Sequence, residues 1–344
     1  MEQLAKAGQL YPLDDSVKQY GWDKAMAPWA LKLGAVDGKL YSLPNEVETL
    51  VLYYNKTLFE QHGWTPPKTI DELVALSEKI KAAGIIPFAH QNTDWKGANE
   101  WYVGEFLNHV AGPQKVYDAL TGKIPWTDPA FANSIDILNN MQQKGWFMGG
   151  LDRYYTATTD EKLQDFADGK AAMNIEGTWA ITSYPDYFSK SAIKADWSWV
   201  PMPSVSGDPI FDLGTGSSYG INAKSAYPKN AAEFLNYFFS PDNQSVMLSK
   251  CGLVPGPVKL DKALLADQDP RYLDILDQLN AAAAKNDIGY LTWTFWPPKS
   301  ETYIIDNIEN VWAGTMTTQD YLAGLQTLFA DELKNGDVPP IPAR

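Results

Sequence analysis

The sequence of 344 residues contains one cysteine, Cys251, and only three histidines. A single cysteine excludes a disulfide within the chain, so we interpret Cys251 as a small buried hydrophobic residue. His62, His90 and His109 occur in unrelated contexts, without a second ligand at the spacing of a metal site, so we expect no bound metal. The sequence also lacks a dinucleotide-binding loop and a G-x-S-x-G nucleophile motif, and it therefore indicates no cofactor.

Positive charge and long apolar runs are also scarce. The chain has 28 Lys and Arg against 42 Asp and Glu, and its formal net charge is −14. Nucleic-acid binding needs clustered cationic side chains, so we expect no nucleic-acid partner. No apolar run approaches the ~18 residues of a membrane helix, and the opening "MEQLAKAGQL" has neither the basic start nor the apolar core of a secretory signal.

Aromatic residues, in contrast, are abundant, with 13 Trp, 18 Tyr and 13 Phe. Most of these rings suit a hydrophobic core, but some stand beside predicted turns. Trp179 ends the stretch "FADGKAAMNIEGTW", and Trp293 and Trp296 stand in "YLTWTFWPP". A ring between a strand and the next helix lies at the sheet edge where open α/β folds bind ligands. Flat rings with polar neighbours are typical of sugar sites, so these tryptophans are candidate sugar contacts.

Short predicted strands alternate with capped helices, a pattern that favours an α/β fold. Thr69 and Glu72 predict a capping box at the start of a helix that ends before Gly84. Asn230 and Glu233 predict a second cap pair. The expected strands cover residues 40–47, 50–55, 171–175, 197–203 and 217–223.

Glu46 and Glu48 are candidates for either binding or catalysis. On a strand, residues two apart place both carboxylates on one face. A glycosidase needs its two acids on opposite sides of the scissile bond, which neighbouring positions of one strand rarely provide. We therefore favour binding over catalysis. A carbohydrate-active hydrolase that uses Glu46 or Glu48 is the alternative.

Four segments, taken in order, resemble the family 1 extracellular solute-binding proteins, which are the sugar-binding subunits of ABC importers. Each segment alone is weakly specific, but their order along nearly the whole chain is specific. The segments are "DGKLYSLPNEVETLVLYYNK" (37–56), "FADGKAAMNIEGTWA" (166–180), "SYGINAKSAYPKNAAEFLNYFFSP" (218–241) and "TFWPPKSETYIIDNIENVWAGTM" (294–316).

The resemblance implies the type II periplasmic binding protein fold, in which two α/β lobes joined by three crossings close on the ligand by hinge motion. It implies a binding protein and not an enzyme, with a neutral mono- or oligosaccharide as ligand and ABC permease subunits as partners. The positions that match ligand contacts of the family are Glu48 with its neighbour Glu46, Trp179 in the turn E-G-T-W, Trp296 or Trp293, and Trp101 or Tyr102.

Family members carry strand and helix units ahead of the segment that matches the start of this sequence, so we expect an incomplete first lobe. We expect lobe one to contain residues 1–46 and 220–288, and lobe two to contain 47–219 and 289–344. The resemblance also implies a periplasmic or extracellular membrane-anchored protein, with the signal segment and any lipid anchor ahead of Met1. A truncated binding protein with impaired ligand binding is a further alternative.

Overall fold

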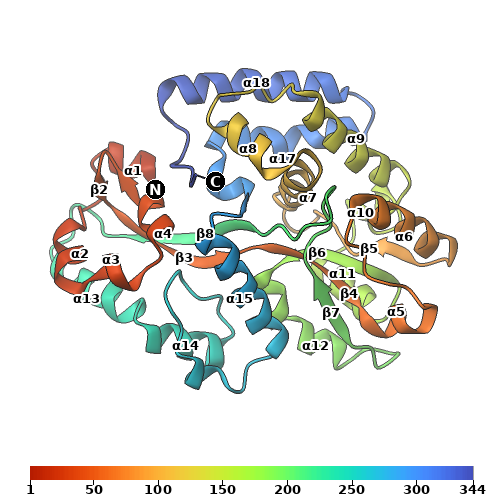
Figure 1. Cartoon of the computed structure of the whole chain (residues 1–344), viewed down its shortest axis with the longest axis horizontal. Coiled ribbons are helices and arrows are strands. Elements are labelled where there is room, and N and C mark those ends of the chain that lie inside the picture. The colour runs from red at the N-terminus through yellow and green to blue at the C-terminus, as the bar shows by residue number, and fades with distance from the viewer. Residues whose placement is uncertain (344) are drawn as a thin grey trace. The chain divides into compact units, whose positions relative to one another are not determined.

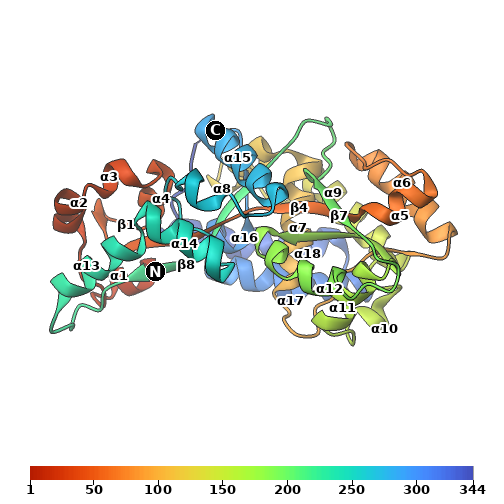
Figure 2. The same ribbon diagram turned by 90° about the horizontal axis from the view of Figure 1, so that it is seen from below.

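The computed structural model describes residues 1–343 as an α/β protein with two compact units (Figures 1 and 2). Unit 1 contains Met1–Glu48, Gly214–Leu273 and Pro339–Pro342. Unit 2 contains Thr49–Leu213, Asp274–Val338 and Ala343. Within residues 1–343, no helix combines the length and the apolar character that crossing a membrane requires.

Unit 1 folds around one apolar cluster that includes Leu13, Trp22, Leu43, Ile221 and Leu235. Strand β3 (Ser42–Glu48) pairs antiparallel with the unit 1 part of β8 (Asp212–Gly220), and β1 (Ala35–Val36) and β2 (Lys39–Leu40) form a short hairpin. The helices are α1 (Glu2–Lys6), α2 (Asp14–Tyr20), α3 (Trp22–Ala25), α4 (Pro28–Leu33), α13 (Pro228–Phe238), α14 (Pro241–Cys251) and the 3-10 turn η3 (Lys262–Leu265).

Unit 2 contains a four-stranded sheet in the order β5-β6-β4-β7. The strands are β4 (Leu50–Asn55), β5 (Ile86–Phe88), β6 (Ala171–Gly177) and β7 (Trp197–Val200). Strand β6 is parallel to β5 and antiparallel to β4, and all seven of its residues are buried. The central place of β6 therefore fixes the position of whatever follows its last residue, Gly177.

Helices surround this sheet and pack on one another. Helices α17 and α18 lie side by side in unit 2 (Figure 1), and α11 lies next to α12 (Figure 2) and also packs against β6. The helical elements are α5 (Lys56–His62), α6 (Ile70–Ala82), α7 (Ala98–Phe106), the π-helical turn η1 (Leu107–Ala111), α8 (Pro113–Leu120), α9 (Pro129–Gln143), α10 (Leu151–Tyr154), α11 (Thr159–Ala167), the 3-10 turn η2 (Thr178–Thr182), α12 (Tyr184–Phe188), α16 (Thr292–Phe295), α17 (Pro298–Trp312) and α18 (Thr318–Asn335).

Local sequence signals predict some element ends correctly and miss others. The capping box of Thr69 and Glu72 is confirmed, because each side chain bonds the backbone N–H of the other residue. The predicted cap pair of Asn230 and Glu233 is wrong: α13 already begins at Pro228, whose fixed φ suits the first turn of a helix. The interpretation of Cys251 is also wrong, because it ends α14 with its side chain exposed.

The bounds of the units differ from the expected lobes. The first change of unit falls after Glu48 and the second after Leu213, close to the expected 46 and 219. The third falls after Leu273, inside α15 (Pro270–Ala284), and not after 288. The reason is β9 (Gly289–Tyr290), which directly follows the expected lobe boundary at 288. It pairs parallel with Asp212 and Leu213 and is wholly part of unit 2.

Candidate functional site

A pocket of about 180 Å³ lies in unit 2, beside the end of β6 and the start of η2. Trp95, Trp101 and Trp179 contribute apolar surface to its wall. Its polar lining includes Lys162 and Glu176. Aromatic faces combined with a few placed polar groups are the usual make-up of a small-molecule site.

The backbone at Gly177 makes room for the ring of Trp179. A Cβ atom at residue 177 would overlap three carbon atoms of the indole ring. Gly177 has φ −80° and ψ 172°, which other residues also adopt. Glycine is therefore needed at this position for space and not for backbone conformation. The ring folds back over the chain that carries it, and it is only half-buried.

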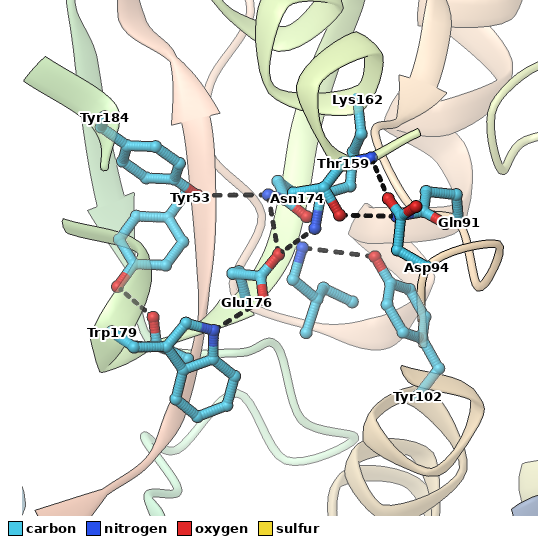
Figure 3. Close-up of polar contacts among 12 residues, drawn as sticks. Tyr53, Gln91, Asp94, Tyr102, Thr159, Lys162, Asn174, Glu176, Trp179 and Tyr184 are labelled. Atoms are coloured by element: carbon cyan, nitrogen blue, oxygen red, sulfur yellow. Dashed lines mark hydrogen bonds and ion pairs between the residues drawn. The ribbon is translucent and has the colours of Figure 1, made fainter. Parts of the chain in front are cut away.

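Glu176 holds the indole ring by its nitrogen. The Nε1–H of Trp179 donates to Oε1 of Glu176 at 3.0 Å, and Figure 3 shows the carboxylate between this ring and Lys162. The other oxygen, Oε2, accepts from Nζ of Lys162 at 2.6 Å and from Nδ2 of Asn174 at 3.4 Å. Because its N–H is occupied, Trp179 presents a ring face and not a hydrogen-bond donor.

Lys162 and Glu176 form a buried ion pair. Their side chains are 6% and 3% exposed, and Lys162 comes from α11 while Glu176 comes from β6. The ammonium group also lies 5.8 Å from the ring centroid of Trp101, within the range of a cation–π interaction. Asn174 supports the carboxylate and donates to the hydroxyl of Tyr184 at 3.2 Å. The pair adds no net charge to the pocket.

The three tryptophans of the wall and Trp293 form a chain of ring contacts. Trp95 and Trp101 lie 5.4 Å apart between ring centroids, and Trp101 and Trp179 lie 5.3 Å apart. Trp293 meets Trp179 edge-on at 6.1 Å. Aromatic contacts of this kind restrain each ring, so the faces are held in place without a ligand.

The polar side of the pocket is fixed by hydrogen bonds at the start of α11. Nε2 of Gln91 donates to the hydroxyl of Thr159 at 3.0 Å, and the amide of Thr159 donates to Asp94 (Figure 3). The hydrogen bonds from Thr159 lower the pKa of Asp94. Behind this region, burial lowers the pKa of His90 well below its ordinary value, and Lys162 acts in the same direction.

The structure separates the aromatic candidates. Trp101 lines the pocket, whereas Tyr102 is 1% exposed and packs on His90 and Phe147. Between the two tryptophans before α17, Trp293 is half-buried and contacts Trp179. The expectation for Tyr102 and for Trp296 needs correction, because both belong to the core of unit 2.

Trp296 is unavailable to a ligand because its side chain, at the end of the one-turn helix α16, packs into the core of unit 2. The ring is 2% exposed and lies 5.3 Å from the ring of Trp126, which is itself fully buried. A ring enclosed in this way offers no face to a ligand. Trp179, Trp101 and Trp293 are the sequence candidates that the structure brings together in unit 2.

Glu46 and Glu48 lie in unit 1, close to each other. A Cβ atom at Gly216 would overlap Oε1 of Glu48 and would lie 2.9 Å from Oε2 of Glu46. The two carboxylates therefore share one face of the β3–β8 pair. Glu46 has φ 59°, a left-handed conformation that is strained for a residue other than glycine. Tyr272 is buried nearby, and burial together with Glu48 raises the pKa of its hydroxyl.

Two further residues of the pocket, Glu176 and Lys162, were not among the candidates expected from the sequence. Glu176 had a usable signal, because an acid inside the mostly apolar strand "AAMNIEG" needs a partner if it is buried. Lys162 had none, since a lysine on an amphipathic helix ordinarily faces solvent.

A second hollow in unit 2, of about 670 Å³, is larger than this pocket. It is lined by the turns that contain Gly145, Gly149 and Gly150, together with Asp152 and Arg153. No aromatic side chain is among its lining residues. Its wide, polar surface lacks the fixed ring faces of the Trp179 pocket, so we take the smaller pocket as the candidate site.

Comparisons with known proteins agree with this architecture. The structure of a chitin oligosaccharide binding protein superposes with a TM-score of 0.82 at 25% identity, covering 97% of this chain and 81% of that one. An ABC transporter extracellular-binding protein of Pyrococcus horikoshii is 25% identical over 98% of this chain and 69% of its own length. The sn-glycerol-3-phosphate-binding periplasmic protein UgpB of Yersinia pseudotuberculosis is 26% identical over 88% of this chain and 67% of its own.

The chain thus spans about two thirds of the length of these two relatives. Its closely matching architecture confirms the two-unit α/β fold class. The family model described as bacterial extracellular solute-binding protein matches residues 1–245, which is well over half of the chain. The chain belongs to the bacterial extracellular solute-binding proteins.

Proposed function

We propose that this protein is the substrate-binding subunit of an ABC importer, and that it captures a neutral mono- or oligosaccharide with the Trp179 pocket of unit 2. The observation that carries the proposal is the half-buried ring of Trp179, whose N–H is bonded to Glu176. What remains for a ligand is an apolar ring face next to polar groups. Sugars match such a surface, because their C–H faces stack on rings while their hydroxyls form hydrogen bonds.

The charges of the pocket favour a neutral ligand. Lys162 is the cation among the described residues that line it, and its ammonium is already paired with Glu176 at 2.6 Å. A phosphate group would need an available cation, or several N–H donors, to offset its desolvation. The pocket is therefore suited to a sugar better than to a phosphate ester such as the one named for the Yersinia relative.

The size of the pocket limits how much of a ligand it holds. Its volume of about 180 Å³ is below the roughly 300–1,000 Å³ of typical pockets for drug-sized molecules. We expect one sugar ring to enter it and to stack on Trp179. The hydroxyls of Thr159 and Ser183 in its lining are suited to bond the hydroxyls of a sugar.

That Glu48 contacts the sugar remains a prediction, and the substitution Glu48→Gln tests it. The alternative of a hydrolase that uses Glu46 or Glu48 is less favoured, since the relatives named above are described as binding proteins. We further expect the protein to act outside the cytoplasm and to deliver its sugar to the permease subunits.

The test is calorimetric titration with a panel of neutral mono- to tetrasaccharides and with glycerol 3-phosphate. We expect at least one neutral saccharide to bind with one-to-one stoichiometry, to perturb tryptophan fluorescence and to be recovered intact by chromatography. Cleavage of the saccharide would support the hydrolase alternative instead. Binding of glycerol 3-phosphate alone would refute the proposed ligand class, and a folded chain that binds no member of the panel would support the alternative of impaired binding.

A further inference from the structure

We infer that Glu105, His109 and Asp212 form a binding site for one divalent transition-metal ion, and that zinc is the ion whose geometry fits best. All three side chains are fully buried in unit 2. From the sequence we expected no metal ligand at His109. The sequence gives no sign of Asp212 as a second ligand, because it lies far along the chain from His109 and only the fold brings the two together.

The distances within this cluster fit coordination better than direct hydrogen bonding. Nε2 of His109 lies 3.3 Å from Oε2 of Glu105 and 3.7 Å from Oδ1 of Asp212. One ligand atom from each residue lies within 4.8 Å of the other two. Two atoms that each bind a tetrahedral zinc at about 2.0–2.1 Å are roughly 3.4 Å apart. Charge-assisted N–H···O hydrogen bonds are shorter, at about 2.7–2.9 Å.

The polar atoms of the cluster are also unsatisfied. If both carboxylates are ionised, no described residue offers a hydrogen-bond partner to an oxygen of Glu105 or Asp212, or to either ring nitrogen of His109. Buried polar atoms without partners are rare in folded proteins, and a bound ion is one of the ligands that satisfy them. Three such side chains that converge on one point indicate a ligand at that point.

Charge leads to the same conclusion. No lysine or arginine within residues 1–343 comes within ion-pair distance of Glu105 or Asp212. Two ionised carboxylates in a dry interior are costly unless a cation offsets them, and the alternative is a proton shared between Glu105 and Asp212, which would leave no zinc bound in the titration below. One divalent ion balances two carboxylates, with a neutral imidazole as the third ligand.

The fold holds the three ligands rigidly. Glu105 is in the last turn of α7, and His109 is in the π-helical turn η1 that continues it. Asn108, between them, bonds both backbone groups of Tyr290 in β9. Asp212 packs against Gly289 of the same strand, where a Cβ atom would overlap its carboxylate. Single π-helical turns inside helices occur frequently at functional sites.

The donor set selects the class of ion. Imidazole nitrogen favours zinc and neighbouring transition metals over magnesium and calcium, which prefer oxygen alone. Three protein ligands leave the fourth position of a tetrahedral zinc to a water molecule. An open fourth position is also the pattern of catalytic zinc sites, but all three side chains are fully buried and none lines the Trp179 pocket, so we assign the ion a structural role in unit 2.

The first experiment uses the full chain without any substitution. The protein is stripped with EDTA, dialysed and titrated with zinc chloride. We expect about one zinc ion per chain by elemental analysis, and a melting temperature raised by about 5 °C at saturating zinc. X-ray absorption at the zinc edge should show one imidazole nitrogen and oxygen ligands at about 2.0–2.2 Å. Retention of less than about a tenth of an equivalent, or a spectrum without imidazole, would overturn the inference.

The second experiment compares two histidines. His109→Gln should lower zinc affinity by at least roughly 100-fold, while His62→Gln, at an exposed position of α5, should leave it unchanged. Equal losses in both variants would contradict the site. If His109→Gln does not fold, the absorption spectrum of the unsubstituted protein decides the question, because it identifies the ligands without any variant.

Discussion

The indole ring of Trp179 lies directly over the backbone of Gly177, in space that any other residue's Cβ atom would fill. The glycine and the tryptophan are therefore one structural feature. The ring keeps its position because Gly177 leaves room on one side and Glu176 bonds its nitrogen on the other. This arrangement leads to the first prediction.

Gly177→Ala should displace the ring of Trp179 and weaken saccharide binding by about 1 kcal/mol, roughly a fivefold loss of affinity. The backbone itself tolerates alanine, because φ at this position is −80°. The control is the same substitution in a Trp179→Ala background, where no ring is left to displace. If alanine at 177 costs the same affinity with and without the ring, the steric explanation is wrong.

Trp179→Ala should reduce affinity more than stability, since its ring is half-buried and faces the pocket. Trp296→Ala is the matched substitution in the core, and it should cost about 3–5 kcal/mol of unfolding free energy. Urea denaturation and calorimetric titration of both variants separate the two roles. A large stability loss in Trp179→Ala with unchanged affinity would place its ring in the core instead.

Glu176→Gln should destabilise the protein by about 3 kcal/mol or more, because it leaves the buried ammonium of Lys162 without a counter-charge. Glutamine still accepts a hydrogen bond from Trp179, so the folded fraction should keep most of its affinity. Adding Lys162→Met removes the unpaired charge and should recover much of the lost stability. A loss below about 1 kcal/mol in the single variant would show that the pair is better solvated than its burial indicates.

Glu48→Gln should weaken saccharide binding by about 1–3 kcal/mol without unfolding unit 1, if its carboxylate accepts sugar hydroxyls. Glu46→Gln tests the neighbouring carboxylate on the same face, and Glu233→Gln at an exposed position of α13 is the control. Unchanged affinity in calorimetry would remove Glu48 from the site. A lower melting temperature with normal affinity would assign it a structural role.

Stability should also depend on pH through Glu100. Burial, with Glu301 as the second cause, raises the pKa of Glu100 to about 8 from an ordinary value of 4.5. Between these two pH values the folded protein retains a proton that the unfolded chain has released. The free energy of unfolding must therefore fall as the pH rises, by at most about 1.4 kcal/mol per pH unit from this group.

Glu100→Gln should remove this contribution, so the variant gains stability relative to the unsubstituted protein as the pH rises from 5 to about 8. Denaturation curves at several pH values measure the change. The exposed substitution Glu233→Gln should leave the pH dependence as it was. A parallel shift of all curves for Glu100→Gln would mean that Glu100 is ionised in the folded state.

Structural features that depend on contacts between neighbouring residues could be predicted correctly from the sequence. Thr69 and Glu72 bond each other within one helical turn, so their spacing alone predicts the helix start. At Pro228, however, a proline two residues before Asn230 overrides the polar cap, and the helix begins earlier than the polar residues suggest. Both helix starts are determined by residues of the first turn alone. The error at Asn230 was therefore avoidable from the sequence.

The site could be predicted only in part, because its remaining residues depend on contacts between distant segments. Trp179 follows a strand and a glycine, which is visible in the sequence, but the burial of Lys162 is explained only by Glu176 from another element. The choice between Trp293 and Trp296 depends on where a one-turn helix ends relative to Trp126. No periodic pattern determines that choice.

Strand β8 also has a consequence for biosynthesis. Its residues Gly214–Gly220 pair with β3, so the ribosome must synthesise residues 49–213 after β3 before the strand pair of unit 1 can form. At about 5–20 residues per second this interval lasts on the order of 10 s, and β9 emerges later still. For about half of its synthesis, the nascent chain therefore leaves β3 unpaired and the early part of the unit 1 apolar cluster without Ile221 and Leu235, and its yield in a cell should depend on chaperones that bind unfolded chains.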